Sequence, residues 1–223
     1  MQNTTDAGRF ADHASQVVLQ AVLATNLTSF TEFAFGVVRP GVTFKPNWHF
    51  EAVTHILSEV ASGEVRRLII TLPPRNLKSL CASVALPAWF LGRNPSERVV
   101  VVSYSDVLAR SHANDFRLVV NHPIYQASFP AMRLERDTDR EITTTKRGKR
   151  IATSIDGTLT GLGGKVMTRR RTSPEATSDS MYVTASKCQF GLKTMPGRTT
   201  PKANSVNDVR FVARRACKTS CGG

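Results

Sequence analysis

Residues 68–80, LIITLPPRNLKSL, decide how this chain of 223 residues folds. The segment begins inside a short aliphatic run over residues 66–72, which is typical of a buried strand. A polar, proline-containing stretch follows, and Lys78-Ser79 then begin a second apolar run that is typical of a helix. Backbone N–H groups of such a loop and of the first helical turn point to one place and can hold an anion. The segment therefore predicts a strand, a phosphate-binding loop and the start of a helix.

The loop matches the phosphate-loop pattern G-x-x-x-x-G-K-[ST] only in part, because both glycines are missing. Two interpretations stay open: a phosphate loop, and an ordinary polar turn whose lysine faces water. In the first, Lys78 binds the β- and γ-phosphates and Ser79 Oγ binds Mg²⁺. The proline pair that includes Pro74 stiffens the loop, and Arg75 adds a permanent positive charge at its phosphate end.

Outside the loop, the hydrophobic pattern alternates between helices and strands. Asn47 is the predicted N-cap of a helix that carries Trp48, Ala52, Ile56 and Val60 on one face. The order predicts an α/β layered fold with a mainly parallel central sheet. The predicted elements are helices over 12–37, 48–61, 78–91 (kinked at Pro87) and 106–120, strands over 66–72 and 98–103, and a hairpin of 142–145 with 150–153.

Composition and charge divide the chain into three parts: a helical segment over 1–40, the α/β part over 41–164, and a basic tail over 165–223. The tail holds 12 Lys+Arg and 3 Asp+Glu, a net of +9 out of +13 for the chain, and has no sustained hydrophobic period. We therefore expect it to be largely disordered. The chain has no apolar run of membrane-spanning length and no secretory leader pattern, so a cytoplasmic location is expected.

Several motifs agree in order and spacing with one protein family. They are PNWHFEAVTHIL at 46–57, LPPRNLKSL at 72–80, the long string from Ala85 to Arg117, and IATSIDGTLTGLGG at 151–164. Over roughly Phe30 to Gly164 the chain resembles the large terminase subunit of tailed bacteriophages and prophages. Members of that family have loops of the PPR-x-x-KS type, so the missing glycines do not argue against the match.

The resemblance implies a P-loop ATPase domain that binds ATP and Mg²⁺ and drives double-stranded viral DNA into a procapsid in the bacterial cytoplasm. It implies the small terminase subunit and the portal as partners, and an oligomeric ring for an intact family member. The loop residues Pro74, Asn76, Leu77, Lys78 and Ser79 would bind the nucleotide, and Arg75 would sense or stabilise the γ-phosphate. The segment Asn47-Trp48-His49 lies where the family places adenine-contacting residues, so Trp48 and His49 would contact the base.

After Gly164 the chain departs from the family. The family continues into an apolar strand that ends in paired acids, whereas this chain continues KVMTRRRTSPEATSDSMYV. Only Glu175 and Asp179 are acidic in residues 165–207; the family's coupling motif is unrecognisable here, and its nuclease domain is expected to be absent. We therefore expect an incomplete P-loop fold with little or no hydrolysis, as a reading frame disturbed after Gly164 would produce. The alternatives are a non-enzymatic nucleic-acid-binding protein that acts through its basic tail, and a degenerate reading frame without a stable product.

Overall fold

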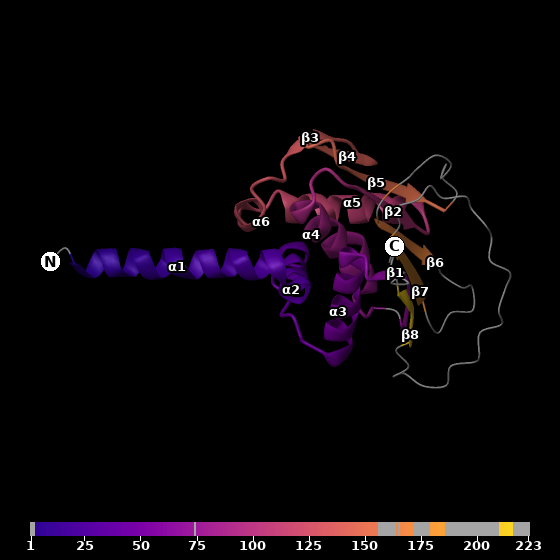
Figure 1. The fold of residues 1–223 in the computed structure, drawn as a ribbon, viewed down its shortest axis with the longest axis horizontal. Coiled ribbons are helices and arrows are strands. Elements are labelled where there is room, and N and C mark those ends of the chain that lie inside the picture. Colours follow the sequence, from indigo (N-terminus) through magenta and orange to yellow (C-terminus); the bar gives the residue numbers. More distant parts are fainter. Residues whose placement is uncertain are drawn as a thin grey trace, which may run out of the picture.

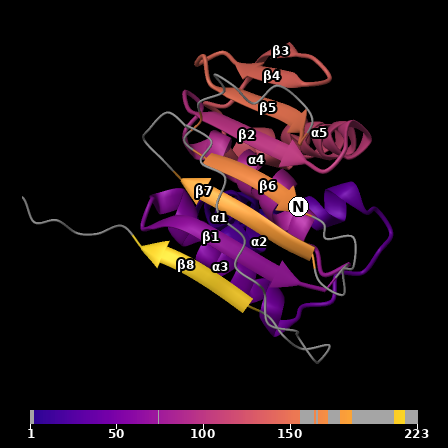
Figure 2. The ribbon, with the colours of Figure 1, turned by 90° about the vertical axis from the view of Figure 1, so that its right-hand side faces the viewer.

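The computed structural model describes residues 3–73, 75–155, 164, 166–171, 179–185 and 210–215. In these ranges the chain is a mixed α/β structure, as expected: eight strands form one sheet, and the described helices cover one of its faces (Figures 1 and 2). The long first helix projects away from this layered body (Figure 1).

The elements have the following bounds. The helices are α1 (Asn3–Thr25), α2 (Leu27–Val38), α3 (Trp48–Ser62), the π-helix η1 (Leu80–Ala85), α4 (Leu86–Arg93), α5 (Asp106–Val120) and α6 (Pro123–Ser128). The strands are β1 (Val65–Leu72), β2 (Arg98–Ser103), β3 (Leu134–Asp137), β4 (Glu141–Thr144), β5 (Lys149–Ser154), β6 (Val166–Arg171), β7 (Asp179–Ala185) and β8 (Arg210–Arg215).

The sheet has the strand order β3-β4-β5-β2-β6-β7-β1-β8. Only β2 has parallel neighbours, β5 and β6. The other five pairings are antiparallel, and β1 lies between the antiparallel strands β7 and β8. The prediction of a mainly parallel sheet is therefore wrong for the described strands, because the neighbours of β1 come from the end of the chain and no local pattern reveals their direction.

Three strands lie within residues 165–223, for which the sequence predicts little order. Strand β6 pairs with β2, while β7 and β8 flank β1 on its two sides. The remainder of this segment lies outside the described residues. The tail therefore supplies both of the strands that pair with the strand of the proposed phosphate loop.

The predicted helix over residues 12–37 is two helices in the structure. Asn26 separates α1 from α2, and its side chain accepts a hydrogen bond from the Ser29 N–H at 3.0 Å, so it acts as the N-cap of α2. Within the described ranges no single helix has both the length and the apolar character of a membrane span. Residues Ala14–Thr25 and α2 pass that test together, but a bend of 107° separates them.

Helix α3 has the predicted bounds but buries a different face. Trp48 is 62% exposed, and Asn47 stands at the N-cap without a side-chain capping hydrogen bond. Thr54 lies on the buried face. Its hydroxyl is satisfied there, because it donates to the Phe50 carbonyl and lies 2.7 Å from Thr28 Oγ1. A buried threonine that is satisfied locally is invisible to a hydrophobic pattern, which explains the wrong choice of face. The buried residues are Phe50, Val53, Thr54, Leu57 and Val60.

The core lies between the sheet and the helices. Leu68, Ile70 and Leu72 of β1 alternate with less buried residues and point to the helical layer. The next layer is aromatic: Phe30 of α2 packs edge-on against Tyr125 of α6 and Phe129, with ring centroids 5.9 and 5.8 Å apart. This packing joins α2 to α6.

Candidate functional site

The loop that follows β1 lies at the edge of the sheet where several strands end. Strand β1 runs in the same direction as β6, because both pair antiparallel with β7. Strand β6 is in turn parallel to β2, and β2 to β5. The carboxyl ends of β1, β2, β5 and β6 therefore meet at one edge, which is where ligands bind in open α/β sheets.

Two residues of this loop adopt the left-handed backbone conformation. Arg75 has φ +67° and Leu77 has φ +55°. For a residue with a side chain this conformation costs roughly 1–2 kcal/mol, and glycine is normally found there. Leu77 directly precedes Lys78-Ser79 and thus occupies the position of the second glycine in the phosphate-loop pattern. Leu77 thus holds, with a side chain, a backbone conformation that glycine adopts without strain.

Lys78 folds back onto the end of β1. Its side chain is buried, and Nζ donates hydrogen bonds to the carbonyl oxygens of Leu72 at 2.5 Å and of Pro73 at 2.7 Å. The alternative of a lysine that faces water is therefore wrong. Burial of an ammonium group is costly unless acceptors surround it, so this loop is built around a cation.

The chain behind Ser79 begins as a π-helix. The Cys81 N–H bonds to the Leu77 carbonyl at 2.9 Å, whereas the Leu86 N–H bonds to the carbonyl of Cys81, five residues earlier. The kinked helix predicted over 78–91 is thus a π-helix, η1, followed by α4, with Pro87 in the first turn of α4. Short π-helices occur frequently at functional sites.

The other predicted loop residues are placed as follows. Asn76 donates from Nδ2 to the Pro73 carbonyl at 3.2 Å, which closes the loop on itself. Ser79 is partly exposed at the first turn of the helix, and its side chain makes no capping hydrogen bond. Arg75 is exposed. Pro74 lies outside the described residues.

Trp48 and His49 are brought to the same edge of the sheet by the topology. Helix α3 packs on β1 and is joined to it by residues 63–64 alone, so it runs back along the strand. Its length of about 22 Å and that of β1, about 26 Å, are similar. The first turn of α3 therefore lies near the end of β1, where the loop begins. The indole of Trp48 packs edge-on against the imidazole of His49, with ring centroids 6.2 Å apart.

An acidic residue that the sequence did not single out as a site residue occupies a register position at this edge. Asp179, the first residue of β7, pairs with Leu72, the last residue of β1. Of the described strands that run toward this edge, β2 ends at Ser103, β5 at Ser154 and β6 at Arg171, whereas β3 ends at Asp137. Asp179 could not be found from sequence, because its place depends on a pairing between distant segments.

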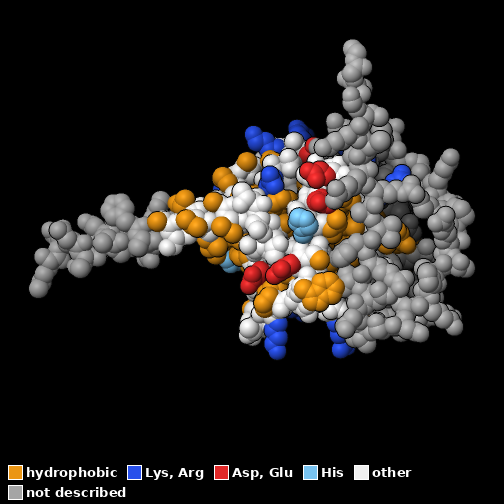
Figure 3. Space-filling view, turned by 60° about the horizontal axis from the view of Figure 1, so that its bottom comes forward, with side chains coloured by type: hydrophobic (Ala, Val, Ile, Leu, Met, Phe, Trp, Pro, Cys, Tyr) orange, Lys and Arg blue, Asp and Glu red, His pale blue; other side chains and the backbone are white. Residues whose placement is uncertain are grey.

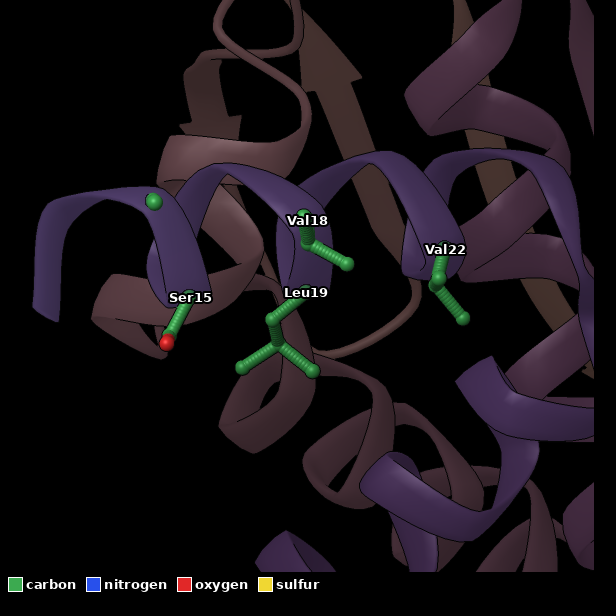
Figure 4. A pocket seen from close by; sticks show the side chains of 5 residues that line it. Ser15, Val18, Leu19 and Val22 are labelled. Atoms are coloured by element: carbon green, nitrogen blue, oxygen red, sulfur yellow. The ribbon is translucent and has the colours of Figure 1, made fainter. Parts of the chain in front are cut away.

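A shallow open groove of about 500 Å³ lies elsewhere, on α1 (Figure 4). Its lining comes from one face of that helix and includes no loop residue: Ala14, Ser15, Val18, Leu19 and Val22. Hydrophobic side chains gather along this part of α1 in the space-filling view (Figure 3). The groove contains no ionisable side chain, so it offers no chemistry for catalysis.

Comparisons with protein-family models, with curated proteins and with solved structures find no match to this chain.

Proposed function

We propose that residues 73–79 bind the phosphates of ATP with Mg²⁺, and that the chain is part of a motor domain similar to that of phage terminase large subunits. The observation that carries the proposal is the buried Lys78, whose amine lies over the end of β1 beside the left-handed Leu77. The buried cation is surrounded by the end of a strand, a tight turn and the start of a helix. This arrangement is suited to binding phosphate.

In this proposal the γ-phosphate replaces backbone carbonyls as the partner of Lys78. The amine is already desolvated, so it exchanges neutral acceptors for a charged one and gains a stronger, charge-assisted hydrogen bond. Ser79 Oγ is available at the first helical turn to bind Mg²⁺, and Arg75 supplies an exposed guanidinium at the loop tip. Trp48 and His49 provide ring surfaces for the base.

We further propose that hydrolysis is slow. Phosphoryl transfer needs a carboxylate that orients the attacking water and holds the metal ion. No described strand ends in paired acids at this edge, where β7 begins at Asp179 and β3 ends at Asp137. The expected partners are double-stranded viral DNA, the small terminase subunit and the portal, in the cytoplasm of a bacterial host.

The test is the affinity of the purified chain for Mg-ATP, measured by titration calorimetry. Lys78→Ala should lower the affinity at least tenfold, because the loop loses its buried cation. Lys146→Ala removes an exposed lysine from the hairpin turn and should leave the affinity unchanged. Equal affinities for the two variants would overturn the proposal, as would ATP turnover at a motor rate for its slow-hydrolysis part.

A second candidate function, non-enzymatic binding of nucleic acid, is favoured by the net charge of +9 over residues 165–223. It predicts DNA binding that weakens steeply with salt and does not depend on Lys78. Measuring DNA affinity at several salt concentrations for Lys78→Ala and for the unaltered chain separates the two functions.

A further inference from the structure

Arg150 on β5 is the largest fully buried side chain of the described residues, with 1% exposure. Its Nη2 donates to two backbone carbonyls of different elements, Ser83 of η1 at 3.2 Å and His112 of α5 at 3.3 Å. The guanidinium also stacks over the Phe116 ring, 4.7 Å from its centroid. One side chain thus joins the sheet to the helix behind the loop and to a second helix.

Pro87 removes one possible hydrogen-bond donor to the Ser83 carbonyl. In an α-helix the carbonyl of residue 83 would accept the N–H of residue 87, but proline has no N–H and its ring clashes with that carbonyl. The chain is π-helical over Leu80–Ala85, just before this proline, and the guanidinium of Arg150 donates a hydrogen bond to the Ser83 carbonyl oxygen. Pro87 and Arg150 therefore act on the same carbonyl, that of Ser83, although 63 positions separate them in sequence.

Burial of Arg150 is costly and is only partly compensated. Its Nε and Nη1 have no hydrogen-bond partner among the described residues. Desolvation lowers the pKa of Arg150 to about 9, the positive charge of Arg117 adds to this, and the Asp115 carboxylate opposes it. A side chain held at such a cost is expected to fix something that a hydrophobic residue of similar size could not.

We propose that Arg150 is a positioning residue for the phosphate loop. By holding the Ser83 carbonyl it keeps η1 in the π-helical register, and it thereby fixes the positions of Lys78 and Ser79. The link to the loop is short. The first helical hydrogen bond, from Cys81 to Leu77, belongs to the same turn that carries Lys78. The inference rests on the proposed binding of ATP and names the residue that pre-organises that site.

The experiment compares Arg150→Met, Arg150→Lys and the control Arg117→Met. Arg117 is a mostly buried arginine of α5 that pairs with Asp137 at 2.5 Å and, among the described residues, hydrogen-bonds to Asn114 and Thr138 instead of η1. For each variant, urea unfolding gives the folded fraction, and titration with Mg-ATP under folding conditions gives the affinity of the folded protein. Hydrogen–deuterium exchange of amides 77–86 reports on η1 without any nucleotide.

Arg150→Met should weaken Mg-ATP binding at least tenfold and speed exchange at residues 77–86, with Arg150→Lys in between. Arg117→Met should lose stability but change neither quantity. Unchanged affinity of folded Arg150→Met would overturn the positioning role. If the unaltered chain fails to bind Mg-ATP, the proposed function fails. Hydrogen–deuterium exchange at residues 77–86 of Arg150→Met then tests separately whether Arg150 anchors η1: faster exchange supports this role, and unchanged exchange overturns it.

A variant at Pro87 tests the link between Pro87 and Arg150 separately, and Arg150→Met that folds only in the Pro87→Ala background would also support it. Pro87→Ala restores an N–H that can bond to the Ser83 carbonyl inside the helix. Arg150→Met should therefore cost less stability and less ATP affinity in the Pro87→Ala background than in the unaltered chain. Additive effects of the two substitutions would show that Pro87 and Arg150 do not act together on the Ser83 carbonyl.

Discussion

Two residues with side chains hold a backbone conformation in this loop that glycine adopts without strain. Arg75 and Leu77 both have φ near +60°. Backbone strain of this kind persists only where the surrounding structure over-determines it, and it gathers at binding sites. At Leu77 the surroundings are visible, because its side chain packs against the core cluster while its carbonyl starts the helix.

Leu77→Gly and Leu77→Ala separate strain from packing. Both remove the same side-chain contacts, but only glycine relieves the left-handed strain, so Leu77→Gly should be the more stable by about 1 kcal/mol. Urea unfolding measures the difference. The same pair at the exposed Leu118 of α5 is the control, where glycine should be the less stable by about 1 kcal/mol. The same order of stability at both positions would show that Leu77 is not strained.

At the scale of single elements, local patterns predict most of what is found. The aliphatic runs predict β1 and β2, and the apolar period predicts α5, whose N-cap Ser105 accepts from the Leu108 N–H. The predicted hairpin is confirmed as β4 and β5. Its turn places Arg147 at φ +67° and Gly148 where a Cβ would lie 2.2 Å from the Pro95 carbonyl oxygen, so only glycine fits there.

Element-scale predictions fail where a distant contact decides the outcome. The π-helix depends on Arg150, which lies far along the chain, although Pro87 was a visible sign of distortion. The direction of the sheet pairings depends on β7 and β8. For the candidate site, Lys78 and its loop were found by local pattern, whereas Arg150 and Asp179 were not, because only the tertiary structure brings them there.

The hairpin contains an ion pair whose pH dependence can be tested. Lys149 Nζ lies 2.6 Å from Glu141 Oε1, and this hydrogen bond lowers the pKa of Glu141 below its ordinary 4.5. The stabilisation is therefore present above pH 4.5 and is lost as the pH falls through the folded-state pKa. Since both side chains are about a third exposed, solvent screens the pair, and Glu141→Gln should cost about 0.5 kcal/mol or less near neutral pH.

Chemical unfolding across the acidic range measures this effect. The difference between Glu141→Gln and the unaltered chain should shrink toward zero as the pH falls below the lowered folded-state pKa of Glu141. Glu135→Gln removes an exposed carboxylate from β3 that forms no ion pair recorded among the described residues, and should show no such trend. A cost for Glu141→Gln that persists at low pH would mean that the charge of Glu141 is not its source.

At the scale of the whole molecule, the described parts of the basic tail contribute strands to the sheet. Strand β1 has β7 on one side and β8 on the other, and both come from residues beyond 165. Removal of the tail would therefore disturb the proposed nucleotide site as well as any nucleic-acid binding. Substitution of individual basic residues, rather than truncation, is the way to separate the two functions.

Truncation at two points tests this architecture. Deletion of residues 210–223 removes β8, and should lower the free energy of unfolding by on the order of 3 kcal/mol, from several ladder hydrogen bonds at about 1 kcal/mol each. Deletion of residues 216–223 alone keeps β8 and should change it little. Urea unfolding compares the two chains, and equal stabilities would show that β8 contributes nothing to the sheet.

The position of β1 between β7 and β8 has a consequence for the nascent chain. Leu72 leaves the ribosome about a hundred residues before its partner Asp179, and β8 follows later still. At ordinary rates of translation β1 waits on the order of ten seconds with both edges unpaired. Such non-local pairing folds slowly and exposes strand edges to other chains. A chain that stops before residue 179 would therefore expose both edges of β1, and the loop that follows β1 would lack its neighbouring strands until β7 and β8 are made.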